Sequence, residues 1–144
     1  MPDFSAYIQS VLRGEILIPV AQLVGFQVIK AEGGQSQLEL EAGPQHANPM
    51  GTLHGGILCD VADAAMGFAF VTTLAEGESF TTLELKINFL RPVWTGRLRA
   101  LGRVVRPGRT ISLVECDVLD DQDRLVARAS STCMTLRGEA AAGR

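Results

Sequence analysis

The sequence has few of the residues on which several common classes of protein depend. It contains two histidines and three widely spaced cysteines, Cys59, Cys116 and Cys133. An odd number of cysteines without a Cys-x-x-Cys pair is not typical of a disulfide framework or a zinc site, so we expect reduced, packed thiols and a cytoplasmic location. Two histidines without a His-x-x-x-His helix argue against a zinc hydrolase, and we expect no metal.

Neither charge nor hydropathy points to nucleic acid or to a membrane as a partner. The net charge is −3 at pH 7, which gives no general attraction to anionic polymers or surfaces. No apolar run is long enough to span a bilayer, and residues 1–5 lack the basic start and apolar run of a signal peptide. With 144 residues, of which 47% are hydrophobic, the chain predicts a single domain, 1–144, with a sizeable core.

Several motifs of known enzymes are also missing. There is no Gly-x-Ser-x-Gly sequence, so the α/β-hydrolase route to ester cleavage is not expected. No glycine pattern of the Walker or Rossmann type is present. The acidic run 120–123 lacks the glycine and the distal glutamate of a calcium-binding loop.

The hydropathy pattern predicts one long helix among several strands. Residues 55–74 are apolar almost all the way round a helix, which is typical of a buried central helix. From Leu83 to Phe89, apolar and polar residues alternate, which indicates a half-buried strand. The other expected elements are strands at 24–30, 36–42, 96–105, 110–119 and 125–136, a short helix at 4–12 within an N-terminal helical segment (1–22), and a flexible tail at 138–144. This content makes the fold class α+β.

The start of the predicted central helix carries the most informative motif. His54, Gly55 and Gly56 open it, and glycines at a helix N-terminus leave backbone N–H groups accessible to a ligand. Asp60 and Asp63 follow, and a carboxylate on an apolar helix is costly unless it has a partner or a task. The combination indicates an amide that polarises a carbonyl group and an acid that assists attack on it. For Asp60 a structural role is favoured, because a negative charge in the first half of a helix suits the helix dipole.

This motif and its surroundings resemble the hotdog-fold thioesterase superfamily, in particular the PaaI-type branch that includes phenylacetyl-CoA thioesterases. The resemblance rests on Asn-Pro-Met-Gly at 48–51, His-Gly-Gly at 54–56, an acid nine residues after His54, and the run ending in Asn-Phe-Leu-Arg-Pro at 81–92. It is specific to the family but not to a substrate. It implies a long central helix wrapped by an antiparallel sheet of five to six strands.

The resemblance also implies an activity. Members hydrolyse an acyl-CoA to the free acid and CoA without a cofactor, and an aryl-acetyl or other aromatic acyl group is implied by the resemblance alone. The implied catalytic acid is Asp63, acting on water as a general base or forming an anhydride as a nucleophile; the sequence leaves both open. The implied oxyanion donor is the Gly55 N–H, and Gly56 beside it is a candidate for substrate contact.

Three further polar residues are candidates for the site. Asn48 and Thr82 match positions where relatives place polar groups that hold water or the carboxylate, with Thr81 as an adjacent competitor. His54 is expected to brace its loop by hydrogen bonding. A structural turn is the competing interpretation of Asn48, because Asn-Pro is a common turn pair.

Six of the thirteen basic residues are arginines between Arg91 and Arg109. Such a run is usually a solvated strand face, but CoA brings phosphates that suit arginine forks. Arg91 and Arg109 of this run are the candidates for CoA contact, and the resemblance supports Arg109, which lies in a Pro-Gly-Arg turn like one near the nucleotide in relatives.

The spacing of Gly55 and Asp63 predicts a homo-oligomer. Eight residues apart on one helix, they stand about 12 Å apart along its axis, too far to meet one thioester carbon. Two antiparallel central helices bring them together, so a homodimer is expected, and relatives commonly pair dimers into tetramers. Two other functions stay open: a hotdog hydratase or dehydratase acting on acyl thioesters, and a non-catalytic acyl-CoA-binding domain.

Overall fold

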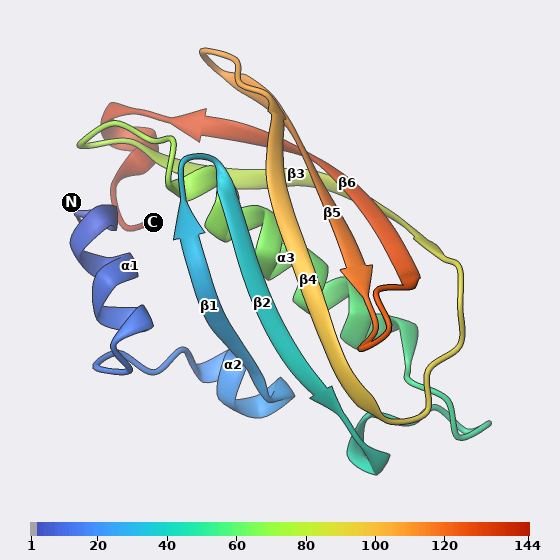
Figure 1. Ribbon diagram of the computed structural model, residues 1–144. Helices are drawn as coiled ribbons and strands as arrows, with labels where there is room; N and C mark the ends of the chain where they lie inside the picture. Colours follow the sequence, from blue (N-terminus) through green and yellow to red (C-terminus); the bar gives the residue numbers. More distant parts are fainter. Residues whose placement is uncertain (1–2) are drawn as a thin grey trace.

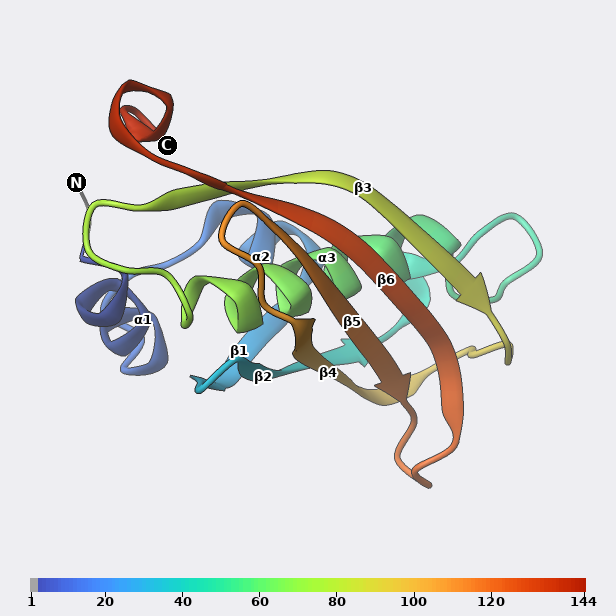
Figure 2. The same ribbon diagram turned by 90° about the horizontal axis from the view of Figure 1, so that it is seen from above.

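The structure, a computed structural model that describes residues 3–144, is a six-stranded antiparallel sheet wrapped around one long helix (Figure 1). The strands lie in the order β1-β2-β4-β5-β6-β3. Their bounds are β1 Phe26–Glu32, β2 Gln35–Ala42, β3 Ser79–Phe89, β4 Gly96–Arg106, β5 Ile111–Leu119 and β6 Leu125–Leu136. Helix α3 (Gly55–Val71) lies in the hollow of the curved sheet (Figure 2). The predicted α+β class, with a long central helix and five to six antiparallel strands, is confirmed.

Helix α3 is held against the sheet by apolar packing and by one close polar contact. Its buried residues include Val61, Ala65 and Met66, each at most 1% exposed. Ser36 Oγ on β2 donates to the Ala65 carbonyl at 2.6 Å. On β4, a Cβ added to Gly102 would lie 2.3 Å from the same carbonyl oxygen. Only glycine therefore allows β4 to pass this close to the helix, and the contact fixes the height of α3 over the sheet.

The structure corrects two features of the predicted helix. It ends at Val71 instead of residue 74, because the hydroxyls of Thr72 and Thr73 donate to the carbonyls of the preceding turn at 2.7 Å. Side chains of this kind compete with continued helical hydrogen bonding. The helix is also not buried on all sides, since Asp60 and Asp63 are exposed. One face of α3 is thus left open in the protomer.

Strand β3 forms one edge of the sheet and is hydrogen-bonded to β6 alone among the described strands. Its pairing shifts between Thr82 and Glu84, which leaves Leu83 as a bulge residue. Leu83 is 52% exposed and Phe89 54% exposed, so the predicted half-buried alternation holds for Leu85 and Ile87 only. A bulge adds one residue and breaks the period of two, which the sequence pattern does not reveal.

The N-terminal segment contains a second helix that we did not predict. Helix α1 (Phe4–Leu12) forms as expected, with Asp3 as its N-cap. Helix α2 (Pro19–Val24) follows, with proline in its first turn and Gly25 at φ 94° as its C-cap. Proline favours the first turn of a helix, and a glycine in the left-handed conformation commonly ends one. As a result β1 begins at Phe26, two residues later than expected.

The C-terminal residues form a short turn, and the cysteines are unpaired. Where a flexible tail was expected, Gly138–Ala141 form a 3-10 turn and Ala141 is fully buried. All three cysteines are free thiols, and burial raises the pKa of the Cys116 thiol to about 12, as for an unreactive packed group. No helix within residues 3–144 is long and apolar enough to cross a membrane.

Candidate active site

The first turn of α3 presents the Gly55 backbone amide without a hydrogen-bond partner in the part of the chain that the structure describes. His54 is the N-cap, and its Nδ1 accepts a hydrogen bond from the Gly56 N–H at 2.9 Å. The Ile57 N–H donates to the His54 carbonyl at 3.0 Å. No hydrogen bond of the Gly55 N–H is found among residues 3–144. His54 therefore braces the turn and occupies Gly56, which leaves Gly55 as the accessible donor.

Gly55 also lies against an aromatic ring at the end of β3. A Cβ added at Gly55 would lie 2.9 Å from Phe89 Cζ and 3.2 Å from Cε1. The ring tip is therefore packed on the Cα of the candidate oxyanion donor. Because Phe89 is 54% exposed, its ring has room to shift, which matters for the choice of substitutions at position 55.

The candidate catalytic acid, Asp63, is paired with Thr82 across the gap between α3 and β3. Thr82 Oγ1 donates to Asp63 Oδ1 at 3.4 Å, a long hydrogen bond. Successive residues of a strand point to opposite faces, so Thr82, and not its neighbour Thr81, shares a face with the acid. The structure thus selects between the two hydroxyl candidates by position.

The surroundings of Asp63 favour its neutral form. Although the side chain is exposed on its open side, desolvation by the apolar atoms around it raises the pKa of the carboxyl above its ordinary value. The hydrogen bond from Thr82 lowers this pKa in part, and the negative charge of Asp60 raises it further. A carboxylate with a raised pKa is a stronger base, which is a common property of catalytic acids and bases.

Asn48 is engaged within its own loop. Its Oδ1 accepts from the backbone N–H groups of Met50 and Thr52 at 2.9 and 3.2 Å, and its Nδ2 donates to Thr52 Oγ1 at 2.8 Å. The structure therefore shows the turn-stabilising arrangement, and no hydrogen bond joins Asn48 to Asp63 among the described residues.

A structural histidine in the same loop carries no motif by which the sequence alone identifies its role. His46 is 5% exposed. Its Nδ1 accepts from the Gly43 N–H at 3.1 Å, and Nε2 lies 2.6 Å from the Val24 carbonyl. Both ring nitrogens are used to tie the loop before α3 to the end of α2.

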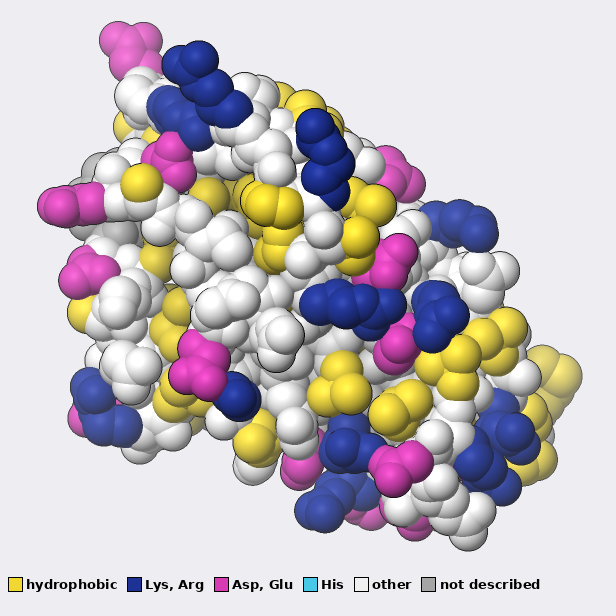
Figure 3. All heavy atoms as spheres, turned by 45° about the horizontal axis from the view of Figure 1, so that its top comes forward, with side chains coloured by type: hydrophobic (Ala, Val, Ile, Leu, Met, Phe, Trp, Pro, Cys, Tyr) yellow, Lys and Arg dark blue, Asp and Glu magenta, His cyan; other side chains and the backbone are white. Residues whose placement is uncertain are grey.

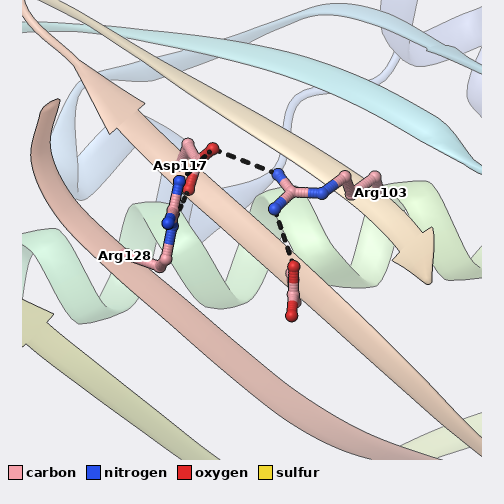
Figure 4. A network of polar contacts seen from close by, with 4 residues as sticks. Arg103, Asp117 and Arg128 are labelled. Atoms are coloured by element: carbon pink, nitrogen blue, oxygen red, sulfur yellow. Dashed lines mark hydrogen bonds and ion pairs between the residues drawn. The ribbon is translucent and has the colours of Figure 1, made fainter. Parts of the chain in front are cut away.

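The arginine-rich strands form ion pairs on the outer face of the sheet. Arg103 bonds Glu115 at 2.7 Å and Asp117 at 3.2 Å, and Asp117 also accepts two bonds from Arg128 (Figure 4). Acidic and basic side chains alternate with apolar patches over this face (Figure 3). The further pairs are Arg97 with Glu39 and Arg99 with Asp123. Several of the arginines between Arg91 and Arg109 therefore lie on a solvated strand face and pair with carboxylates of this chain.

The two arginines proposed for CoA contact make no ion pair among the described residues, but they lie far apart. Arg91 follows the end of β3. Arg109 lies two residues before Ile111, the first residue of β5. Ile111 pairs with Met134 of β6, and Met134 pairs with Thr81 near the start of β3. At about 3.3 Å per residue, roughly 30 Å of strand separates the two levels, so one protomer does not bring both to the same phosphate.

The comparison with known proteins identifies the family. The sequence profile of the thioesterase superfamily matches residues 50–127, which include Gly55, Asp63 and Thr82. The chain belongs to this superfamily. It is a thioester hydrolase, and its resemblance to PaaI-type hotdog proteins is confirmed.

Relatives of known or proposed activity cover most of the chain. A putative esterase from Saccharolobus solfataricus is 32% identical over 118 residues, which cover 82% of this chain and 84% of the relative. A solved structure of a putative thioesterase related to phenylacetic acid degradation, from Ralstonia eutropha JMP134, is 34% identical with a TM-score of 0.80, covering 89% of this chain and 98% of that one. The medium/long-chain acyl-CoA thioesterase YigI of Salmonella typhimurium is 23% identical over 141 residues, covering 85% of this chain and 91% of the relative.

Proposed function

We propose that the protein hydrolyses an acyl-CoA to the free acid and CoA. The observation that carries this proposal is the arrangement on α3: an unpaired Gly55 N–H at the helix start and, two turns later, the Asp63 carboxylate with its raised pKa. The relatives differ in acyl group, since one is named for phenylacetic acid degradation and another for medium and long chains. Because the protein resembles the relatives named for phenylacetic acid degradation, we propose that its substrate carries an aromatic acyl group.

The reaction follows from these two groups. The Gly55 N–H binds the thioester oxygen as it gains negative charge, and one such donor lowers the barrier by about 3–4 kcal/mol. Asp63 takes a proton from water as the water oxygen bonds to the carbonyl carbon, or its oxygen attacks that carbon to form an anhydride that water then cleaves. In both routes the carbon–sulfur bond breaks and the thiolate of CoA leaves and is protonated. Thr82 orients the carboxylate through its hydrogen bond.

The complete site requires two protomers. Gly55 and Asp63 lie on one helix about 12 Å apart, and both lie where the protomer is open. The 11 residues of β3 form an edge that has no strand neighbour on its outer side among residues 3–144, and Leu83, Phe89 and Trp94 near it are 52–60% exposed. Long apolar edges of this kind are normally covered in a folded protein. A two-fold axis beside β3 covers this edge and places Gly55 of one protomer opposite Asp63 of its partner.

The same two-fold axis bears on CoA recognition. It reverses the direction of β3 in the partner, so Arg91 of one protomer comes level with Arg109 of the other. We propose that these two arginines contact CoA phosphates across the interface, since no carboxylate pairs with either in the described residues. That dimers pair into tetramers stays a prediction. A cytoplasmic location, which we expect because the cysteines are free thiols, also stays a prediction.

The test is release of free thiol from a panel of short, long and aromatic acyl-CoA substrates. We expect turnover without added metal or cofactor, with the highest kcat/KM on an aromatic acyl-CoA. Tight binding without thiol release would indicate an acyl-CoA-binding domain instead. Hydration of an enoyl-CoA without loss of the thioester would indicate a hydratase, although His54 already uses Nδ1 to cap the helix.

A further inference from the structure

Helix α1 contributes to the walls around the candidate catalytic acid, although it lies outside the residues that match the family profile. A cavity of about 250 Å³ opens beside Asp63 and extends along α3 toward Val71. It is lined by Phe4 and Tyr7 of α1, Asp63, Gly67 and Phe68 of α3, and Phe80 and Thr82 of β3. Apart from Asp63, Thr82 and the hydroxyl of Tyr7, these side chains are apolar.

The position of α1 is fixed by packing and not by sequence proximity. The carboxylate of Asp3 caps its first turn by accepting from the N–H groups of Ser5 and Ala6. Ile8 is 4% exposed and packs with Ala31 of β1 and Val71 at the end of α3. In both ribbon views α1 lies at the end of the molecule where α3 finishes (Figures 1 and 2). Phe4 and Tyr7 therefore form a docked wall at the end of the cavity away from the start of α3.

Gly67 is the residue whose missing side chain opens this space. It lies one turn beyond Asp63 on α3, and a Cβ added there would have its nearest neighbour at 3.4 Å, the Phe80 Cζ atom. Packing therefore tolerates alanine. Glycine inside a helix costs about 1 kcal/mol relative to alanine, so the glycine is unfavourable for the helix and its benefit lies in the space that it leaves.

We propose that this cavity receives the acyl group and that Phe4 and Tyr7 of α1 close its far end, so that the enzyme selects a compact, flat acyl group over an extended chain. The inference rests on the proposed acyl-CoA hydrolysis. An apolar cavity of about 150 Å³ is enough to hold benzene, so this one has room for a ring and its link to the thioester carbon. The rings of Phe4, Tyr7 and Phe80 provide edges and faces for aromatic contact.

Two substitutions change the cavity in opposite directions. Gly67→Ala adds a methyl group to its wall, whereas Tyr7→Ala opens its far end. A single methylene of misfit in an apolar pocket changes kcat/KM by about 10- to 200-fold. Gln9→Ala is the matched control, because Gln9 is exposed on the same helix and does not line the cavity.

The experiment compares kcat/KM for acetyl-CoA, phenylacetyl-CoA and octanoyl-CoA, with the melting temperature as a folding control. We expect Gly67→Ala to lower the ratio of phenylacetyl-CoA to acetyl-CoA at least tenfold without lowering the melting temperature. We expect Tyr7→Ala to raise the ratio of octanoyl-CoA to phenylacetyl-CoA by a similar factor, and Gln9→Ala to leave both ratios unchanged.

Unchanged ratios in either cavity variant, or octanoyl-CoA as the best substrate of the parent enzyme, would overturn this inference and leave the proposed function standing. A parent protein that releases thiol from none of the three substrates would overturn the proposed function, and this inference with it.

Discussion

Replacing Asp63 by asparagine should separate catalysis from folding. Asparagine keeps the size of the side chain and its capacity to accept a bond from Thr82, which lies 3.4 Å away, but it is neither a base nor a nucleophile at neutral pH. Loss of general-base catalysis alone lowers turnover by about 10²–10⁴-fold, equivalent to about 3–5 kcal/mol of activation free energy.

The direction of the effect on stability follows from the raised pKa. A carboxyl whose pKa is higher in the folded than in the unfolded state binds more protons when folded, so its ionisation opposes folding at every pH above the folded-state pKa. Burial is the main cause of this shift for Asp63. At neutral pH the neutral asparagine removes that penalty, and the melting temperature of Asp63→Asn should equal or exceed that of the parent.

Asp60→Asn is the matched control on the same helix. Asp60 is exposed and acts on Asp63 through its charge. Like-charge repulsion between residues three apart on a helix is about 0.2–0.5 kcal/mol, so the change in turnover should be roughly twofold. The assay is thiol release at saturating acyl-CoA, with thermal melting on the same samples. Parental turnover in Asp63→Asn, or a larger loss in Asp60→Asn, would refute the assignment of the catalytic acid.

Three other outcomes are expected. In the pH profile of kcat, Asp60→Asn should move the acidic limb to lower pH, because removing a repelling charge lowers the pKa of Asp63. Thr82→Val should move the same limb to higher pH, because the hydrogen bond that lowers this pKa is lost. Shifts in the same direction would contradict this electrostatic explanation. Gly102→Ala, whose Cβ would lie 2.3 Å from the Ala65 carbonyl oxygen, should lower the free energy of unfolding in urea by about 1–3 kcal/mol, and an unchanged value would mean that the sheet yields there. Arg109→Ala should raise KM for acyl-CoA about tenfold or more with kcat nearly unchanged; an equal rise for an acyl-pantetheine would show that no nucleotide contact is lost.

The sequence predicted the elements whose patterns are local. Strand β6 has its expected bounds, 125–136, and α3 begins at the expected Gly55. The start of α3 was predictable because a capping side chain and two glycines act within one turn. The missed helix, α2, is six residues long. That is too short to establish a period, and its proline favours a first turn as much as a break.

The site was predictable by residue type but not by arrangement. The sequence favours Thr82 and leaves Thr81 as a competitor, and only the folded position of β3 shows that Thr82 is the one that faces Asp63. The bulge at Leu83 is likewise a property of the paired strands. The aromatic wall from α1 was not predictable, because Phe4 and Tyr7 are about 60 residues from Asp63 in sequence and meet it only through packing on the end of α3.

We expect each active site to take Gly55 from one protomer and Asp63 from the other. The first variant that tests this removes only the amide donor. Gly55→Pro deletes the N–H at the first position of α3, where proline is well tolerated. The preceding His54 has ψ 133°, a conformation that suits a residue before proline. Gly55→Ala is the control, because it meets the Phe89 ring in the same way but keeps the N–H. Gly55→Pro should lose about 10²–10³-fold in kcat, while Gly55→Ala should lose far less.

The decisive measurement is the activity of heterodimers that carry Gly55→Pro in one protomer and Asp63→Asn in the other, purified through two different affinity tags. Each parent variant alone should be nearly inactive. In the heterodimer, two-fold symmetry places an intact Gly55 opposite an intact Asp63 at one of the two sites, so about half of the wild-type turnover per dimer should return. If the heterodimer stays as inactive as its parents, both groups belong to one protomer's site and the account of a shared active site is wrong.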